Sequence, residues 1–599
     1  MTFKSIGLVV AVIFATFAGL NNDVHAFKID EGVEGYWYEA GLNARRGWGL
    51  QYLKTGPEQG VLFVAGFVYD NINEPIWVTG DALVWDGQHE VNMSLQLIEG
   101  GTFGPDAGNP VVVNDHIVFL RILFKSCNSA EFTFSGDLHQ FSQDFDPFLE
   151  LVGGAREGRC IYQREFTECP QWADPGMGER SCVISDTFDH DIVLTNEINW
   201  ELNGIVHIGA KAEQGQPVPE DGPTLTIEAG TRIRGFDGSA LVISRGSKII
   251  AEGQPHAPIV MGGYFSTIEG AHAGDWGGLI INGAATINGC ASPPCENDSE
   301  GDTGAYGGTN DDDDSGILRY VRIQYAGGVV DHQEDEDIPG LSLEGVGRGT
   351  VIDHVQIHRS LDDGLKLHGG TVNLDYLVVT EAQNDGIDWS DGYRGQIQHA
   401  LVWQRDVAGG WGERGIEGEN GDGDFAYNGP NATPRSMPAL SNITLVGNFG
   451  HEAVNVRAGS GGRFSNLVIV GYERGINIDD EATFLAAGTP QNQSGVLTFD
   501  NVIAWTNHDW FSDDDSSPPW WLADFMAAGT GNTSGISPGL YTGAGYNFIP
   551  PQGPYTWYLR DHGLDRDLFG DFFKDTGYAG AFRSSDSAWH YRWAEFLHE

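Results

Sequence analysis

The sequence predicts a mainly β protein: a small antiparallel β domain, then a long parallel β-helix, then a segment that caps it. Three observations predict this fold. A short sequence phrase rich in Val, Ile and Leu recurs through the middle of the chain. In the N-terminal part of the chain, short aromatic-rich runs alternate with turns. Glycine makes up 84 of the 599 residues without a Gly-X-Y period, which indicates many turns. A chain of this length is expected to form several domains or one long repeat.

The composition limits the class of partner. The chain has 84 acidic and 33 basic side chains, which gives a formal net charge of −51. Such a surface repels phosphate, so nucleic acid is not expected as a partner, whereas divalent metals suit it. Hydrophobic residues at 40% and aromatic residues at 11% exclude a disordered chain despite this charge.

Residues 1–26 have the pattern of a secretory signal peptide. Lys4 gives a positive start, residues 6–20 are apolar, and small residues precede a cleavage site at Ala26. The apolar run is too short to span a bilayer, and no later stretch is apolar enough to do so. We therefore expect a secreted protein, outside the cell or at the surface of the envelope, with no transmembrane segment in the mature chain.

Residues 27–160 predict the small antiparallel β domain, as a meander or a barrel. Trp37, Trp48 and Trp77 lie in its alternating runs and could form an aromatic face that stacks on sugar rings. The alternative is that these side chains fill the core of the domain, since aromatic side chains bury well. Residues 161–188 carry two cysteines and little periodicity, which predicts a linker held by a disulfide.

Six cysteines in an exported chain favour disulfides over thiol chemistry. The expected pairs are local: Cys127 with Cys160, Cys169 with Cys182, and Cys290 with Cys295. A metal site is the other interpretation, but the chain has no Cys-x-x-Cys motif.

The β-helix is predicted over residues 189–510. The repeated phrase is one apolar residue, two mostly polar residues, and then Val, Ile or Leu. It starts at Leu318, Ile352, Leu374, Ile397, Leu440, Phe464 and Phe499. The intervals are 34, 22, 23, 43, 24 and 35 residues, and the shortest match one coil of a parallel β-helix. The longer ones indicate inserted loops. Residues 511–599 lack the phrase and are expected to cap the solenoid, because an open end would expose strand edges.

Acidic residues recur at one position of successive coils and are candidate calcium ligands. The candidates are Asp362, Asp363, Asp385, Asp388, Asp391 and Glu417. Asp363 and Asp385 are 22 residues apart, so they should stack at about 4.8 Å. Like charges at that distance repel unless a cation neutralises them, and calcium accepts several oxygen ligands. The alternative is a solvated ladder of turns in which Asp and Asn cap their own backbone.

Catalysis is a second possibility for the same coils. The candidate catalytic residues are Lys366, His368, Arg394 and Asp388. A polysaccharide lyase would use calcium to neutralise a uronate and a basic side chain to remove the adjacent proton. A glycoside hydrolase would use two carboxylates instead. The alternative is that the basic residues are counter-ions of the acidic stack.

Several motifs resemble the exported, right-handed parallel β-helix proteins of bacterial envelopes, which are pectate-lyase-like and largely uncharacterised. The motifs are LTIEAGT (225–231), GDWGGLI (274–280), LSLEGVGRGT (341–350), DDG (362–364), GGTVN (369–373), DGYRG (391–395) and FFKDTGYAGAF (572–582). The resemblance implies a right-handed solenoid at the cell surface or outside the cell, and no particular reaction.

Together these patterns favour a secreted, calcium-stabilised protein that binds a polysaccharide or a cell-surface glycan. Two alternatives stay open. One is a polysaccharide lyase or glycoside hydrolase that acts on an extracellular polymer at residues 362–419. The other is a purely structural envelope or matrix protein.

Overall fold

The computed structural model describes the barrel and solenoid strands and much of the chain between them. The described residues are 33, 35–39, 47–56, 59–69, 75–85, 90–99, 111–126, 129–136, 148–153, 168–178, 180–255, 257–264, 271–288, 290, 294–330, 338–404, 412–421, 429–447, 450–512, 518–535, 537–542, 545–546, 572–583, 589–590 and 593–594. The predicted signal peptide and the predicted pair Cys127–Cys160 lie outside them. Within these ranges, no helix is both long and apolar enough to cross a membrane.

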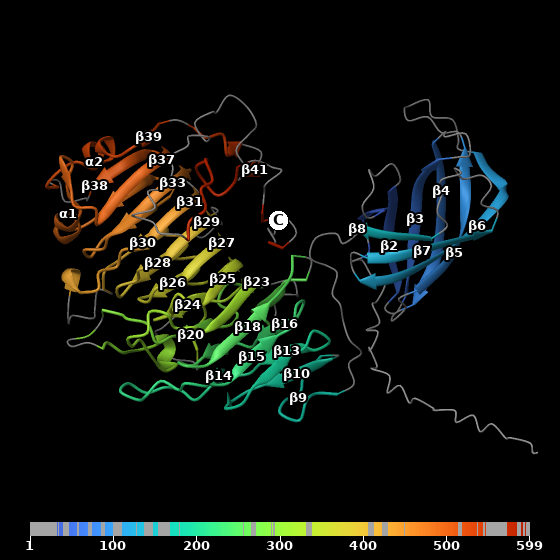
Figure 1. Cartoon of the computed structure of the whole chain (residues 1–599), viewed down its shortest axis with the longest axis horizontal. Helices are drawn as coiled ribbons and strands as arrows, with labels where there is room; N and C mark the ends of the chain where they lie inside the picture. The colour runs from blue at the N-terminus through green and yellow to red at the C-terminus, as the bar shows by residue number, and fades with distance from the viewer. Residues whose placement is uncertain are drawn as a thin grey trace, which may run out of the picture.

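Eight antiparallel strands near the N-terminus form a closed barrel, in which the first strand pairs with both the second and the eighth (Figure 1). They are β1 (Gly35–Glu39), β2 (Gly47–Gly56), β3 (Gln59–Tyr69), β4 (Pro75–Trp85), β5 (Glu90–Glu99), β6 (Val111–Ser126), β7 (Ser129–Gly136) and β8 (Phe148–Gly153). Side chains alternate across each strand, so every second residue faces the interior. The predicted antiparallel β domain is confirmed.

The barrel core contains two of the three tryptophans that were candidates for sugar binding. Trp37 and Trp48 are fully buried. Trp37 packs against Phe124 with ring centroids 5.6 Å apart, and its indole N–H donates to the carbonyl of Val33 at 3.0 Å. Trp77 is 37% exposed. The expected sugar-stacking face of Trp37, Trp48 and Trp77 is therefore not formed, because its first two members fill the core.

The described residues between 181 and 534 wind into coils of parallel strands that stack into two long sheets (Figure 1). The short-strand sheet contains β11 (Thr187–Phe188), β14 (Ile205–Ile208), β17 (Ala240–Ile243), β20 (Gly278–Asn282), β24 (Leu341–Glu344), β26 (Leu365–His368), β28 (Ile387–Ser390), β30 (Arg414–Gly418), β32 (Glu452–Val456), β34 (Arg474–Ile478) and β38 (His508–Ser512). Each strand pairs with the strand of the next coil, so residues far apart in sequence become side-by-side neighbours.

The second sheet, the long-strand sheet, has 16 strands. They are β9 (Asp174–Pro175), β10 (Ser181–Ile184), β12 (Ile192–Leu194), β13 (Asn199–Leu202), β15 (Thr224–Ile227), β16 (Arg232–Gly235), β18 (Lys248–Glu252), β19 (Ile259–Gly263), β23 (Gly316–Gln324), β25 (Val351–His358), β27 (Asn373–Thr380), β29 (Gln396–Trp403), β31 (Ala439–Val446), β33 (Gly462–Val470), β37 (Leu497–Trp505) and β39 (Thr533–Ser534). Parallel pairing runs from Ser181 to Ser534, so the solenoid extends beyond the predicted 189–510 at both ends.

The repeated phrase marks a bend within each long strand. Its third residue has a left-handed conformation, with φ between 50° and 58°, at Tyr320, His354, Tyr376, His399, Asn442, Asn466 and Asn501. In β23 the residues before the bend pair with β18 and those after it pair with β19. This conformation costs about 1–2 kcal/mol for most L-residues and least for Asn. The first four rings stack on one another at 4.4, 4.4 and 4.7 Å, which offsets part of that cost.

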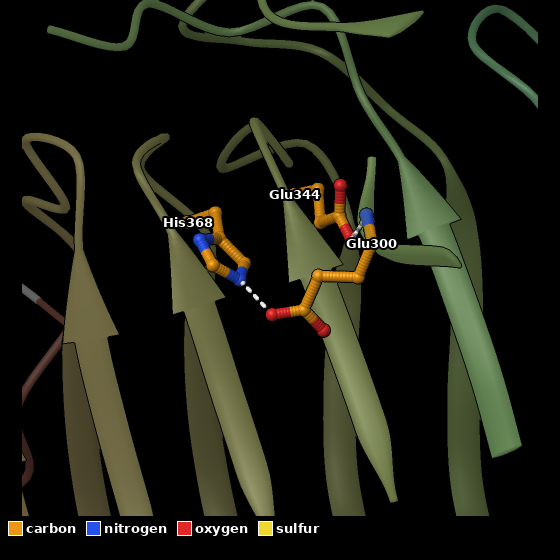
Figure 2. Close-up of side chains that lie close together, drawn as sticks. All are labelled: Glu300, Glu344 and His368. Carbon is orange, nitrogen blue, oxygen red and sulfur yellow. Dashed lines mark hydrogen bonds and ion pairs between the residues drawn. The ribbon is translucent and has the colours of Figure 1, made fainter. Parts of the chain in front are cut away.

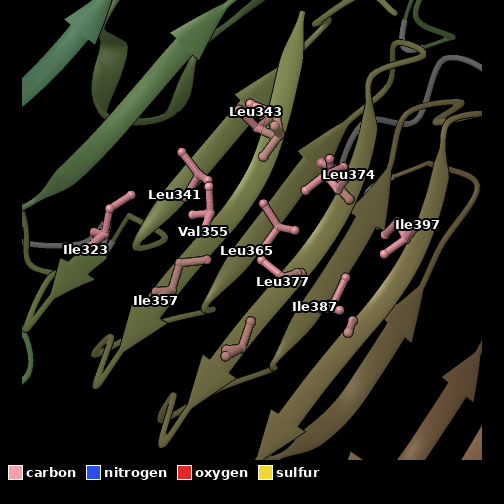
Figure 3. Close-up of a cluster of buried hydrophobic side chains, with 14 of the residues drawn as sticks. Ile323, Leu341, Leu343, Val355, Ile357, Leu365, Leu374, Leu377, Ile387 and Ile397 are labelled. Atoms are coloured by element: carbon pink, nitrogen blue, oxygen red, sulfur yellow. The ribbon is translucent and has the colours of Figure 1, made fainter. Parts of the chain in front are cut away.

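The core lies between the two sheets and is filled by aliphatic side chains in columns. Leu341, Leu365 and Ile387 of successive short strands face Val355 and Leu377 of the long strands (Figure 3). All five are buried. A single coil cannot bury its inward face alone, so each coil depends on its neighbours for the free energy of burial.

Both ends of the solenoid are covered. At the first coil Trp172 stacks on Trp200, with centroids 5.4 Å apart, beside the disulfide Cys169–Cys182. At the last coils the helices α1 (Glu481–Ala487) and α2 (Leu522–Ala528) bury Phe484 and Phe525. Of the predicted capping segment 511–599, the part that contains α2 covers this end, whereas the described residues 572–583, 589–590 and 593–594 pack along the long-strand sheet.

The remaining elements are small. They are η3 (Glu300–Asp302), η4 (Gly429–Asn431) and the two-stranded ribbons β21 (Asn297–Asp298) with β22 (Ala305–Tyr306), β35 (Gly488–Thr489) with β36 (Asn492–Gln493), and β40 (Tyr541–Thr542) with β41 (Gly545–Tyr546). The ribbon β21–β22 and η3 belong to an insertion, residues 290–316, which is held by the disulfide Cys290–Cys295. Both described disulfides have the predicted pairing.

Candidate functional site

Charged side chains gather on the outward face of the short-strand sheet, over β26, β28 and β30. Leu365 and Leu367 point into the core, so Lys366 and His368 of the same strand point outward. The register places Lys366 beside Asp388 of the next coil, and Asp388 beside Glu417 of the coil after that. The sheet thus carries a continuous column of charge across three coils.

Asp363, Asp385 and Asp388 form a group that we call the carboxylate cluster. They offer oxygen atoms that all lie within 4.8 Å of one another. The backbone N–H of Asp385 donates to Oδ1 of Asp363 at 2.9 Å, so the two residues are neighbours, as the spacing of 22 residues predicts. The three side chains are only 1–2% exposed. The cluster is therefore a closed ladder and not the floor of an open cleft.

Lys366 is the counter-ion of this cluster. Its ammonium donates to Oδ2 of Asp388 and lies 3.5 Å from Oδ2 of Asp363. Burial lowers the pKa of Lys366, but the charges of Asp388 and Asp363 outweigh burial and raise that pKa well above its usual value. A firmly protonated amine cannot accept a proton near neutral pH. Lys366 is therefore not positioned to act as the base of a lyase.

The carboxylate cluster is short of positive charge even with Lys366 in place. Neither oxygen of Asp385 has a hydrogen-bond partner among the described residues, and its ion pair with Arg414 is 3.5 Å long. Oδ1 of Asp388 is also without one. Burial, and then the neighbouring carboxylates, raise the pKa values of Asp363 and Asp385 well above normal. A buried carboxylate without a partner is costly, so the cluster is suited to hold a proton or a cation.

The other predicted calcium ligands do not all join the cluster. Asp362 accepts a hydrogen bond from Asn384 at 3.2 Å, and burial together with the charge of Glu300 raises its pKa to about 6. Glu417 is neutralised by Arg414 at 3.2 Å and by Arg457 at 2.9 Å.

Asp391 belongs to a different group, because the strand carries it past the cluster to the following turn. It accepts from the hydroxyl of Tyr306 at 3.1 Å and lies 3.6 Å from Nδ1 of His368. The six expected ligands therefore do not surround one ion.

Two predicted catalytic residues are also placed differently from the expectation. Arg394 forms a two-pronged ion pair with Asp311 of the insertion, both contacts being 3.2 Å, and not with the carboxylate cluster. His368 contacts Glu300 of the insertion, with Nε2 2.8 Å from Oε1. Burial lowers the pKa of His368, but the charges of Glu300 and Asp391 raise it well above normal. His368 is thus a paired cation and not an available base.

A polar pocket of about 410 Å³ opens beside the carboxylate cluster on the same face. Its lining residues are Glu413, Arg414, His451, Glu452, Asn455, Glu473, Arg474, Asn477 and Asp479. Arg414 links the two sites, since it also contacts Asp385 and Glu417. The pocket was not predicted, although Asn455 and Asn477 are 22 residues apart and stack in register.

The pocket contains buried acceptors without partners. The side-chain amides of Asn455 and Asn477 donate to Glu452 at 2.8 and 3.0 Å. Their Oδ1 atoms are buried and make no hydrogen bond within the described structure. Native proteins rarely leave such atoms unsatisfied, so these oxygens indicate a place for a ligand or for water.

Two sheets of parallel strands wound coil upon coil, with polar columns on the outward face, define a parallel β-helix protein. The family described as "Pectate-lyase like beta helix domain" matches residues 189–536, which is more than half of the chain, and the chain belongs to this family. Comparison with curated proteins gave no match.

Among solved structures, the chain is similar to the catalytic domain of a GH87 α-1,3-glucanase variant in complex with nigerose. The identity is 10%, the coverage is 85% of this chain and 95% of that chain, and the TM-score is 0.27. It is also similar to the catalytic unit of a thermostable GH87 α-1,3-glucanase from Streptomyces thermodiastaticus, with 11% identity, 84% and 91% coverage, and a TM-score of 0.23. Scores this low carry no inference about what the present chain binds or cleaves.

Proposed function

We propose that this protein is a secreted glycan-binding β-helix protein. The polar pocket would hold a sugar unit, and calcium at the carboxylate cluster would stabilise the adjacent coils. The observation that carries the proposal is the pair of buried, unsatisfied amide oxygens of Asn455 and Asn477 inside the pocket. Secretion is supported by the signal-peptide pattern of residues 1–26 and by two disulfides, which persist in oxidising compartments.

The chemistry of the pocket favours uncharged sugars over uronates. A sugar hydroxyl both donates and accepts, so it can satisfy an amide oxygen and a carboxylate at once. Arg414 and Arg474 are the basic groups that a uronate would need, and both are ion-paired, Arg474 with Glu452 at 2.7 Å. Glu473 and Asp479 add further negative charge to the lining. A carboxylated sugar would therefore be repelled.

Binding to a panel of neutral and uronate polysaccharides tests this proposal. Asn477→Ala should weaken binding of a neutral glycan about tenfold, because a lost hydrogen bond to a buried group costs roughly 1–3 kcal/mol. Asn282→Ala is the matched control: Asn282 is also buried on the short-strand sheet but lies on β20, outside the pocket. Equal affinity for Asn477→Ala and the wild type, or no glycan binding at all, would contradict the proposal.

The calcium part of the proposal is supported by the donors present. The carboxylate cluster offers only oxygen ligands, three of them unsatisfied, and hard oxygen donors are what calcium prefers. Calcium titration by calorimetry should show binding that Asp385→Asn removes. Asp375→Asn, which changes an ion-paired carboxylate on the long-strand sheet, should leave it unchanged. The absence of calcium binding by the wild-type chain would refute this part.

Hydrolysis of the bound glycan is a second candidate function, and one observation favours it. Burial raises the pKa values of Asp363 and Asp385, so either of them could donate a proton, and the carboxylate of Asp388, which receives the Lys366 ammonium, lies beside them. Release of reducing ends that is lost in Asp388→Asn would support a hydrolase. Unsaturated products that absorb ultraviolet light would instead indicate a lyase.

A further inference from the structure

We propose a second metal site, for a divalent transition-metal ion such as Zn²⁺, formed by Glu300, Glu344 and His368 (Figure 2). This site lies outside the carboxylate cluster and outside the polar pocket, and it does not depend on the proposed function.

The three side chains come from three segments of the chain. Glu344 ends β24 and His368 ends β26, and the two residues are register partners on the outward face of the short-strand sheet. Glu300 reaches them from η3 of the insertion, with its carboxylate against the imidazole (Figure 2). One ligand atom of each residue lies within 4.8 Å of the other two. An ion could therefore contact all three after small side-chain movements.

The imidazole of His368 is oriented as a metal ligand would be. Its Nδ1 lies 3.1 Å from Oγ of Ser390 and 3.6 Å from Oδ2 of Asp391. These contacts leave Nε2 facing Glu300 at 2.8 Å. A metal-bound histidine in proteins usually has its other ring nitrogen held by a carboxylate or a similar acceptor, which fixes the ring and its tautomer.

A second, independent observation supports a cation site here. Glu344 is 0% exposed, and its Oε1 accepts from Ser342 at 2.9 Å and from the backbone N–H of Glu300 at 3.4 Å. Its Oε2 is buried and has no hydrogen-bond partner in the described part of the chain, and the same is true of Oε2 of Glu300. Among ion pairs of the described residues, His368 is the one partner of Glu300 and of Asp391, and Glu344 has none. Three carboxylates thus lie around a single imidazole, and only those of Glu300 and Asp391 are paired with it.

The donor set selects the class of ion. One imidazole nitrogen with carboxylate oxygens suits zinc and related transition metals, whereas calcium takes oxygen ligands alone. The ion would replace the proton between Nε2 of His368 and Glu300. Because Glu300 belongs to the insertion, binding would also fix the insertion to the solenoid next to the carboxylate cluster.

The test uses the full chain after treatment with a chelator. Zn²⁺ titration by calorimetry should show one ion that binds about tenfold or more weakly in His368→Gln and in Glu344→Gln. Co²⁺ should give a visible absorption band in the wild type that both variants lose. His399→Gln is the matched control, since His399 is likewise buried and paired with a carboxylate, Asp375, at 2.8 Å.

Three outcomes separate the proposal from its alternatives. Asp385→Asn should keep zinc binding even where it loses calcium, which distinguishes the two sites. Glu300→Gln, on the insertion, reports on the site if a substitution within the sheet prevents folding. Equal zinc affinity in the wild type, His368→Gln and Glu300→Gln, or no cobalt band in the wild type, would overturn the proposal.

Discussion

The Lys366 ammonium lies between the buried carboxylates of Asp363 and Asp388, its side chain is only 13% exposed, and it is the counter-ion of both. Removing one member of a buried ion pair leaves an uncompensated charge, which costs about 3–5 kcal/mol. We therefore predict that Lys366→Met lowers the free energy of unfolding by about 3 kcal/mol, measured by urea denaturation.

Two further variants check that charge, and not shape, causes this loss. Lys366→Met combined with Asp388→Asn should recover part of the stability, because both charges are then gone. Lys248→Met, which breaks the exposed pair Lys248–Asp314, should cost less than about 1 kcal/mol. A Lys366→Met protein as stable as the wild type would show that the cluster does not need its counter-ion.

His590 gives a prediction about pH. It is buried against Phe582, with ring centroids 4.8 Å apart, and burial lowers its pKa to about 4. In the unfolded chain its pKa is about 6.5, so the unfolded state binds the proton first as the pH falls. His590 therefore does not lower the free energy of unfolding above pH 6.5, and it lowers that free energy increasingly as the pH drops towards 4.

The loss from His590 should reach at most about 3 kcal/mol, since one pKa unit corresponds to about 1.4 kcal/mol. Comparing urea denaturation at pH 7 and pH 4.5 for the wild type and His590→Phe isolates this contribution. The variant should lose less stability than the wild type between the two pH values. Equal losses would mean that other groups account for the pH dependence.

At the scale of single elements, Trp593 is one of the contacts by which the described C-terminal residues, 572–583, 589–590 and 593–594, pack on the long-strand sheet. The Trp593 ring is buried beside His354, at 5.5 Å between centroids, and its backbone carbonyl accepts from Arg322. Truncating a buried Trp to Ala usually costs about 3–5 kcal/mol. We predict that Trp593→Ala loosens this segment, so that the amide of Gly580, which donates to Asn466 at 2.8 Å, exchanges hydrogen faster.

The control for this prediction is a tryptophan of the same C-terminal region that packs poorly. Trp521 is 60% exposed, so Trp521→Ala should leave both the exchange of Gly580 and the overall stability nearly unchanged. Unchanged protection of Gly580 in Trp593→Ala would show that the backbone contacts hold the segment without the ring.

The coils could be predicted because the same pattern of apolar and polar residues recurs at the spacing of one coil. A spacing of 22 residues between Asp363 and Asp385 was enough to place them side by side, since each strand repeats the register of the last. The same rule would have found Asn455 with Asn477, and Glu344 with His368, 24 residues apart.

The sequence indicated inserted loops, but the place where the insertion docks on the solenoid could not be predicted from it. Glu300 meets His368 from 68 residues away, and Asp311 meets Arg394 from 83 residues away. Neither contact follows a strand register, because an inserted loop can dock on any nearby face of the solenoid. For that reason the sequence did not predict the contacts of His368 and Arg394, whereas the spacing of 22 residues did predict that Asp363 and Asp385 are neighbours.

At the scale of the whole molecule, the described hydrophobic residues form separate cores. The barrel core contains residues from Val33 to Phe134, and the main solenoid core begins at Cys182. No residue belongs to both of these clusters. Two cores that do not share residues can unfold independently, so calorimetry should show two transitions and not one.

Calcium binding then tests whether the barrel and the solenoid unfold as separate units. A ligand that binds only the folded state stabilises it by about 2.7 kcal/mol at 100 times its Kd. Since the carboxylate cluster lies on the solenoid, calcium should raise the temperature of the solenoid transition by a few degrees and leave that of the barrel in place. A chelator should reverse the shift, and Asp385→Asn should abolish it. If calcium moves both transitions equally, or moves neither, the ion does not act through the coils that hold Asp363, Asp385 and Asp388.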